Sequence, residues 1–141
     1  MNKTVISSSA EETQSIGESF AKTLKKGGLI YLTGQLGSGK TTFVQGVARG
    51  LGVTQRIISP TFVLVREHKT KHSAIQRLFH VDLYRIANNS HVEGLNFTEM
   101  LNNDTNLVLV EWPDRVTTLP KSMMNIYLTQ IDDMKREIKF I

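Results

Sequence analysis

Residues 34–42, with the sequence GQLGSGKTT, combine the residue types that bind a phosphate chain. This segment, called the phosphate loop below, fits the pattern G-x-x-x-x-G-K-[ST] at every fixed position. Glycines 37 and 39 let the backbone approach an anion closely, so that successive N–H groups can point at the β-phosphate. Lys40 adds a positive charge for the β- and γ-phosphates. The Thr41 hydroxyl suits Mg²⁺, a hard cation that takes few protein ligands. We therefore predict a site for a nucleotide with Mg²⁺.

The segments on either side of the phosphate loop have the expected character. Residues 29–33 form a short apolar, β-branched run, which predicts a buried strand. Residues 42–51 predict a helix, because Phe43, Val47 and Leu51 recur at four-residue spacing. Strand, glycine-rich turn and helix are the context that the motif requires. Within it, Thr42 has two interpretations, a second phosphate contact or an ordinary residue of the first helical turn.

Two acidic residues are candidates for the metal and for the chemistry. Four apolar residues, 107–110, precede Glu111, which is the pattern of a buried parallel strand that delivers a carboxylate to the phosphate loop. In hydrolases with this loop, such an acid holds the Mg²⁺ shell. Asp82 lies near the end of a second strand, predicted at 77–83, where it can hold a metal-bound water or polarise an attacking water. The strand before Glu111 is more uniformly apolar and hence more central, so we favour Glu111 for the metal.

Other polar and aromatic residues have more than one interpretation. His80 is predicted to be a packed or hydrogen-bonded histidine, because no second histidine accompanies it at metal-binding spacing. Trp112 is either a core residue or a residue that packs near the nucleotide. Ser59 and Thr61 flank Pro60 and either sense the γ-phosphate and Mg²⁺ or only shape a proline turn.

The rest of the chain must position these residues. Ser9 and Glu12 form an S-x-x-E capping box before a helix with one apolar stripe. The predicted elements in chain order are a strand at 4–6, a helix after Ser9, a strand at 29–33, a helix at 42–51, paired strands at 61–67 and 77–83, a weak helix at 92–101, a strand at 107–111, a short helix after Pro113, and a hairpin over 124–141 that turns at Asp132 and Asp133.

Length and composition limit the remaining possibilities. The 141 residues suffice for one domain with a real core, and the 40% hydrophobic and 21% charged shares are ordinary for a soluble protein. We find no run long enough to span a membrane and no signal-peptide core at the start. Without cysteine there is neither a disulfide framework nor a thiolate metal site, so we expect a cytoplasmic protein. The net charge of +4 permits contact with nucleic acid without arguing for it.

Four motifs follow the capped first helix, which contains Thr13. They are GQLGSGKTTF at 34–43, SPTF at 59–62, HVDLYR at 80–85 and LVEWPDR at 109–115. In this order, and over nearly the whole chain, they resemble the TsaE (YjeE) family, small bacterial ATPases needed for threonylcarbamoyl modification of tRNA. The loop alone is common to many families, whereas the other three motifs are far more specific. The chain departs slightly at Gln35, where the family usually has an acid, and at Ser38, where alanine is frequent.

The resemblance implies a fold and an activity. The fold is α/β, a single P-loop NTPase-like domain over residues 1–141 with a central mixed sheet flanked by helices and a C-terminal β-hairpin. The activity is Mg²⁺-dependent ATP hydrolysis that is weak when the protein is alone. The implied partners are TsaD and TsaB, which transfer the threonylcarbamoyl group to the adenosine beside the anticodon, so that tRNA is contacted indirectly.

The resemblance also implies roles for individual residues. Lys40, Asp82 and Glu111 are the expected catalytic residues, with Asp82 assisting hydrolysis. Thr41 and Glu111 hold Mg²⁺. The residues expected at the nucleotide are Thr13, Gly37, Ser38, Gly39, Lys40, Thr41, Thr42 and Trp112.

Three other functions compete with this interpretation. A small P-loop nucleotide or metabolite kinase needs an acceptor site and an arginine-bearing lid, and little chain remains after Glu111 to build them. A GTPase needs N-K-x-D and D-x-x-G signatures, and the sequence has neither. A binding module without activity need not keep Lys40 and Thr41.

Overall fold

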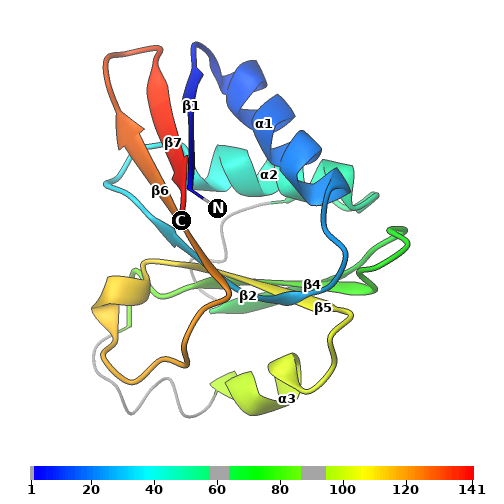
Figure 1. Ribbon diagram of the computed structural model, residues 1–141. Coiled ribbons are helices and arrows are strands. Elements are labelled where there is room, and N and C mark those ends of the chain that lie inside the picture. Colours follow the sequence, from blue (N-terminus) through cyan, green and yellow to red (C-terminus); the bar gives the residue numbers. More distant parts are fainter. Residues whose placement is uncertain (1, 58–63, 87–94) are drawn as a thin grey trace.

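The computed structural model describes residues 2–57, 64–86 and 95–141, and within them one seven-stranded sheet carries the other elements (Figure 1). The elements are β1 (Lys3–Ser7), α1 (Ala10–Lys22), β2 (Gly28–Thr33), α2 (Lys40–Gly50), β3 (Val65–Lys69), β4 (Arg77–Asp82), α3 (Phe97–Leu101), β5 (Asn106–Glu111), the 3₁₀ turn η2 (Pro113–Arg115), β6 (Met124–Gln130) and β7 (Arg136–Phe140). The predicted α/β fold with a mixed sheet and a C-terminal hairpin is confirmed.

The order of the strands places the carboxyl ends of β2, β5 and β4 side by side. The order is β1-β7-β6-β2-β5-β4-β3. Strand β5 lies between β2 and β4 and is parallel to both, so all three strands end at the same edge of the sheet. In this register Asp82 lies opposite Glu111. The prediction that the strand of Glu111 is central and adjacent to the strand before the phosphate loop is confirmed.

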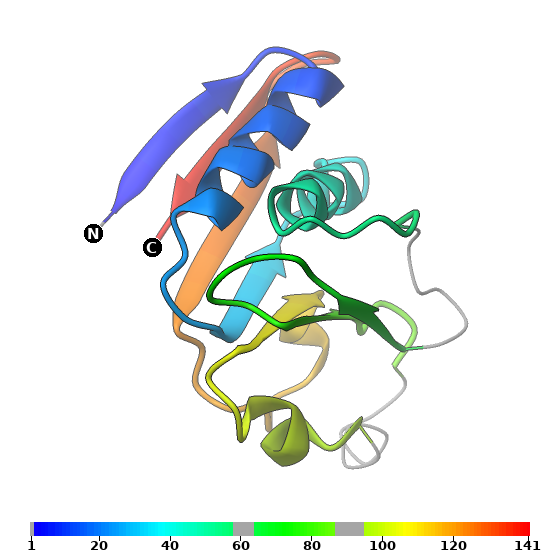
Figure 2. The same ribbon diagram turned by 90° about the vertical axis from the view of Figure 1, so that its right-hand side faces the viewer.

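The two faces of the sheet are covered by different helices. Helices α1 and α2 lie on one face and α3 on the other, as the two views in Figures 1 and 2 show. On β5, Leu107 and Leu109 pack in the cluster under α1 and α2. Val108 and Val110 pack in the cluster under α3. A strand buried on both faces needs apolar residues without alternation, which is why this run is continuously apolar.

Helix α1 begins as predicted, because the Ser9 hydroxyl accepts a hydrogen bond of 3.0 Å from the Glu12 N–H. It packs closely on α2, where both helices use glycine at the contact. A Cβ atom added at Gly46 would lie 2.0 Å from the Gln14 carbonyl oxygen, and one at Gly17 would lie 2.5 Å from that of Phe43. The close packing joins α1 to the first turn of α2 at Phe43.

Several predicted boundaries differ from the observed ones, and two of these differences have a structural cause. Strand β3 continues to Lys69, two residues beyond the predicted end, because residues 65–69 pair along their whole length with β4. The predicted helix at 92–101 is described only from Leu95 onward, and there it is shorter, since α3 begins at Phe97. Its cap residue Asn96 has φ of 56°, a left-handed conformation that a helix interior cannot contain.

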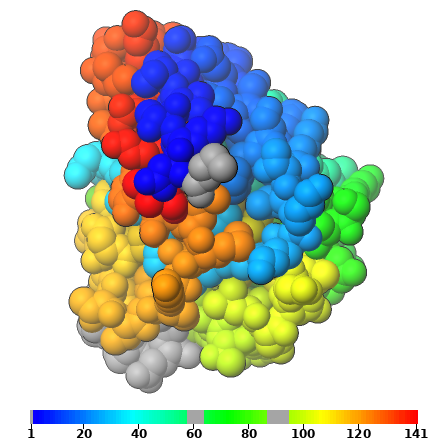
Figure 3. All heavy atoms as spheres, in the orientation of Figure 1, coloured from blue at the N-terminus to red at the C-terminus, as the bar shows by residue number. Residues whose placement is uncertain are grey.

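The C-terminal hairpin turns at Asp132, as predicted. The Asp132 carboxylate accepts hydrogen bonds from the N–H groups of Met134 and Lys135, at 2.8 and 2.7 Å, and these bonds lower its pKa. Strand β7 then pairs antiparallel with β1, so the two ends of the chain lie side by side on the surface (Figure 3). Among the helices in the described part of the chain, none is long and apolar enough to cross a membrane.

Candidate functional site

The phosphate loop connects β2 to α2 through two left-handed glycines. Gly37 has φ of 79° and Gly39 has φ of 99°, conformations that residues with a side chain rarely adopt. Gly39 is also the cap residue of α2 and, having no side chain, makes no side-chain cap to this end of the helix. The first N–H groups of α2 and the positive end of its dipole are therefore the natural partners of an anion at the loop.

Lys40 lies inside the loop. Its side-chain Nζ donates hydrogen bonds to the carbonyl oxygens of Gly34 and Gln35, at 2.5 and 3.0 Å, and lies 4.2 Å from the centre of the Trp112 ring. The residue is only 6% exposed. Burial lowers the pKa of Lys40, against the opposing effect of nearby carboxylates, of which Glu111 is the strongest. A buried ammonium group of this kind gains from an anionic ligand.

A hollow of about 460 Å³ opens beside the loop and is called the loop hollow here. It brings together most of the predicted site residues from three separate parts of the sequence. Its lining residues are Leu36, Gly37, Gly39, Lys40, Thr41, Thr42, Asp82, Tyr84, Arg85, Glu111, Trp112 and Arg136. The parallel order of β2, β5 and β4 accounts for this convergence, since ligands bind outside the carboxyl ends of parallel strands.

The oxygen atoms in the loop hollow fit a magnesium ion. The Thr41 hydroxyl lies 3.5 Å from Glu111 Oε2. One hydroxyl and one carboxylate are the hard donors that Mg²⁺ accepts when phosphate and water supply the remaining ligands. Among the described residues, no group of three or more histidine, cysteine or acidic side chains surrounds a common point, so a metal cage built from protein alone is not found there.

Asp82 lines the same hollow but makes different contacts from Glu111. Its Oδ1 accepts a hydrogen bond of 2.9 Å from the Tyr84 N–H, two residues further along the chain. It is buried, with 6% exposed, beside the paired residue Glu111. The two acids thus share one edge of the sheet, with Glu111 directed to Thr41.

Thr13 and Ser38 lie outside the lining of the loop hollow. Thr13 lines a smaller hollow of about 280 Å³, which adjoins the first because both contain Gly39, Thr42 and Arg136. Its hydroxyl pairs with that of Ser7 at 2.6 Å. The Ser38 side chain is buried, and the Ser38 backbone N–H donates a hydrogen bond to the Gln35 carbonyl oxygen within the loop.

Trp112 belongs to an aromatic and cationic stack at the rim of the loop hollow. It has φ of 60° and follows directly on β5. The Tyr84 ring lies 4.9 Å from the Trp112 ring, and the Arg115 guanidinium lies 4.8 Å from the Tyr84 ring. Trp112 thus lies beside Lys40, and it also packs against the core cluster under α3; a contact with the nucleotide stays a prediction. Tyr84 and Arg115 stand within the motifs HVDLYR and LVEWPDR, which was the available signal for them.

The comparisons with known proteins agree with this geometry. The chain matches the sequence model of the family described as "Threonylcarbamoyl adenosine biosynthesis protein TsaE" over residues 7–138. The chain belongs to the TsaE family.

Curated relatives in this family match most of the chain. Proteins from Nostoc sp. and Rickettsia bellii are each 37% identical to it, and each is named tRNA threonylcarbamoyladenosine biosynthesis protein TsaE. The matches cover 90% and 96% of this chain and 78% and 92% of the relatives. The crystal structure of Bacillus subtilis YdiB superposes with a TM-score of 0.75 at 29% identity, over 99% of this chain and 84% of that one.

One residue at the site was not among those predicted. Arg136 comes from β7 and lines both hollows, and the sequence analysis missed it because nothing near it resembles a motif. The candidates Ser59 and Thr61 lie outside the described residues.

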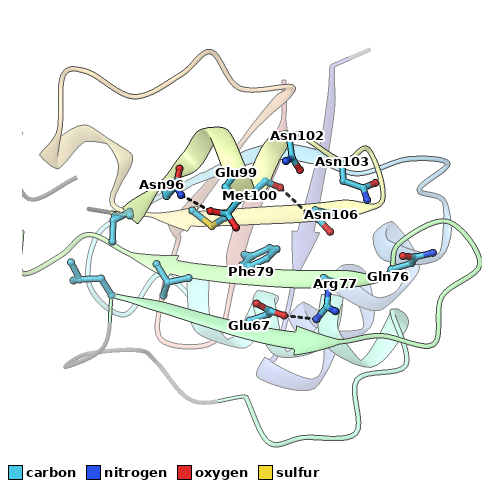
Figure 4. Close-up of a pocket in the computed structure, with 13 residues that line it drawn as sticks. Glu67, Gln76, Arg77, Phe79, Asn96, Glu99, Met100, Asn102, Asn103 and Asn106 are labelled. Atoms are coloured by element: carbon cyan, nitrogen blue, oxygen red, sulfur yellow. Dashed lines mark hydrogen bonds and ion pairs between the residues drawn. The ribbon is translucent and has the colours of Figure 1, made fainter. Parts of the chain in front are cut away.

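A larger hollow lies on the other face of the sheet (Figure 4). It measures about 780 Å³ and is bordered by β3, β4 and α3, with Phe79 and Met100 among its lining residues. Among its charged residues, Arg77 forms an ion pair with Glu67, and Glu99 accepts a hydrogen bond from Asn96. Its lining contains no residue of the phosphate loop. Size alone therefore does not identify the nucleotide site of this TsaE protein.

Proposed function

We propose that this protein is a Mg²⁺-dependent ATPase that acts in the biosynthesis of threonylcarbamoyladenosine in tRNA. The observation that carries the proposal is the convergence of Lys40, Thr41 and Glu111 in one hollow at the end of a glycine-rich loop. The names of the TsaE relatives support the pathway. The proposed partners are TsaD and TsaB, and tRNA is contacted through them.

The phosphate groups are held by the loop and by Lys40. The backbone N–H groups at the start of α2 and the side chain of Thr42 bind the phosphate oxygens, with Gly37 and Gly39 allowing the close approach. Lys40 exchanges its carbonyl partners for the β- and γ-phosphates and offsets their charge. Thr13, in the adjoining hollow, and Trp112, at the rim, flank the nucleotide.

Thr41 and Glu111 would hold the magnesium ion, whose chemical contribution is to neutralise charge on the β- and γ-oxygens. Asp82 lies beside Glu111 and is directed into the same hollow, where it can accept a proton from, or orient, the attacking water. Its contact with the Tyr84 N–H fixes the carboxylate in that direction.

Single-turnover reactions with γ-labelled ATP test the proposal against a kinase. We expect label in free phosphate, more of it when TsaD and TsaB are present, and ATP preferred to GTP in competition. Label in a phosphorylated metabolite would assign the protein to the kinases instead. No binding of either nucleotide in calorimetry would overturn the assignment of the loop hollow.

A further inference from the structure

A buried histidine contacts the proposed metal-binding acid. His80 lies on β4, and its ring is completely buried on the α2 side of the sheet. His80 Nε2 lies 2.5 Å from Glu111 Oε2. An ionised carboxylate accepts hydrogen bonds and cannot donate one, so with Glu111 ionised, as a metal ligand must be, His80 Nε2 carries the hydrogen and donates it. The same oxygen, Oε2, is the one that the Thr41 hydroxyl approaches.

The other ring nitrogen of His80, Nδ1, explains why the contact with Glu111 accounts for a histidine at this position. His80 Nδ1 is buried and has no hydrogen-bond partner among the described residues. A buried polar atom without a partner costs free energy, whereas leucine or methionine would fill the same space without that cost. In the described part of the structure, the ring's one hydrogen bond is the bond to Glu111, which therefore accounts for a histidine at this position.

His80 does not itself meet a ligand. It contributes no atom to the lining of the loop hollow, and its exposed fraction is 0%. It contacts the same Glu111 oxygen that the Thr41 hydroxyl approaches. The carboxylate is thus held by a donor from β4 and approached by a hydroxyl from α2.

We propose that His80 is a positioning residue, which fixes the Glu111 carboxylate in the orientation that binds Mg²⁺ together with Thr41. The inference rests on the proposed function, because it gives Glu111 its role. Carboxylate ligands of metals are commonly oriented by such outer hydrogen bonds, whose loss costs roughly 10–100-fold in metal affinity.

Three substitutions of His80 separate positioning from packing. His80→Gln keeps an N–H donor at about the reach of Nε2, His80→Asn keeps an amide that is too short to reach Glu111, and His80→Met keeps the length without a donor. Calorimetry with a non-hydrolysable ATP analogue, with and without Mg²⁺, measures how much the metal strengthens binding. The Mg²⁺ effect is the ratio of the nucleotide affinities with and without Mg²⁺. We expect this ratio to fall roughly 10–100-fold in the Met and Asn variants and to be largely retained in the Gln variant. Affinity without Mg²⁺ should stay unchanged in all three.

A double-mutant cycle gives the matched control. In a Glu111→Gln background, His80→Met should cause no further loss of the Mg²⁺ effect, because two residues that act through one contact are not additive. Additive losses would show that His80 acts through packing alone and would overturn the proposal.

A measurement on variants that keep His80 covers the case in which its substitutions prevent folding. In ¹⁵N-resolved imidazole spectra, the wild type and Asp82→Asn should show a slowly exchanging proton on His80 Nε2, and Glu111→Ala should lose it. An unchanged signal in Glu111→Ala would overturn the proposal. If the wild type itself binds no nucleotide, the proposed function fails. If it binds with a normal Mg²⁺ effect and His80→Met does the same, only the role of His80 fails.

Discussion

The two halves of the sheet differ in what their strand ends carry. In the parallel half, β2, β5 and β4 run in one direction and end in the phosphate loop, Glu111 and Asp82. In the antiparallel half, β6, β7 and β1 alternate in direction, and the turn between β6 and β7 lies at the surface. Parallel strands gather polar groups from distant parts of the chain at one edge, whereas antiparallel neighbours end at opposite edges.

The antiparallel half instead supplies packing. Phe140 on β7 lies 5.3 Å from the ring of Phe20 on α1 and 6.1 Å from that of Phe43 on α2. These rings join the outer strands to the helix that begins in the phosphate loop. Substitutions in the parallel half should therefore change chemistry. Apart from Arg136, which lines both hollows at the loop, substitutions in the antiparallel half should change stability.

The largest expected effect is that of Lys40→Ala. The loop loses its only positively charged side chain, so phosphate release should fall about 100-fold or more, by analogy with the loss of one preorganised donor. The midpoint of thermal unfolding should not fall, because the variant removes a buried charge whose pKa is lowered by burial. Nucleotide titration and a phosphate-release assay check the first part. Wild-type affinity together with wild-type turnover would contradict the assignment.

The next effect separates the two acids of the parallel half. Glu111→Ala should chiefly lose the Mg²⁺ dependence of nucleotide binding, because Glu111 lies beside Thr41. Asp82→Ala should keep binding and lose hydrolysis by roughly 10²–10⁴-fold, the usual contribution of a group that acts on the attacking water. Mg²⁺·ATP affinity and the single-turnover rate are measured for both. The opposite pattern would reverse the two roles.

In the antiparallel half, Phe140→Ala should lower the free energy of unfolding by about 3–5 kcal/mol, as expected for loss of a buried aromatic ring. The turnover of the folded fraction should stay unchanged, since Phe140 lines neither hollow at the loop. Denaturant unfolding and the rate per folded molecule are the two measurements. A large loss of turnover at full folding would break the comparison between the halves.

The charge of Lys40 can be tested without substitution. Because its pKa is lowered from 10.5, nucleotide affinity should begin to fall with rising pH earlier than for an ordinary lysine. Stability without nucleotide should change in the opposite direction. Between the lowered pKa of the folded protein and 10.5, the unfolded chain binds more protons than the folded protein does. The free energy of unfolding therefore rises with pH in that window. Both trends should be absent in Lys40→Ala. If nucleotide affinity still falls at alkaline pH in that variant, the fall belongs to another group.

The smallest effect should come from the contact between β1 and α1. Ser7 on β1 is fully buried and shares a hydrogen bond of 2.6 Å with Thr13. Ser7→Ala leaves the Thr13 hydroxyl without this partner and should cost about 1–3 kcal/mol of stability. Nucleotide affinity should fall less than it does in Lys40→Ala, because Thr13 only lines the adjoining hollow. Ser15→Ala, on the other side of α1, is the matched control.

Much of the site was predictable because it is local. Several of its features depend only on neighbours in the sequence. They are the helix cap, the left-handed glycines, the lysine and threonine at the start of a helix, and the acid after an apolar run. The predictions of where β3 ends and where α3 begins were less accurate. Pairing with β4 extends β3, and the left-handed conformation of Asn96 sets the start of α3.

The sequence by itself determined the phosphate loop, the character of the strands that end in Glu111 and Asp82, and the resemblance to the TsaE family. Only the tertiary structure decided that β4 is the second neighbour of β5, which brings Asp82 and His80 to Glu111. It also brought Arg136 from the far end of the chain to the loop hollow. The physical reason is that a strand's composition shows whether it is buried, whereas its neighbours follow from how all the strands and helices pack together.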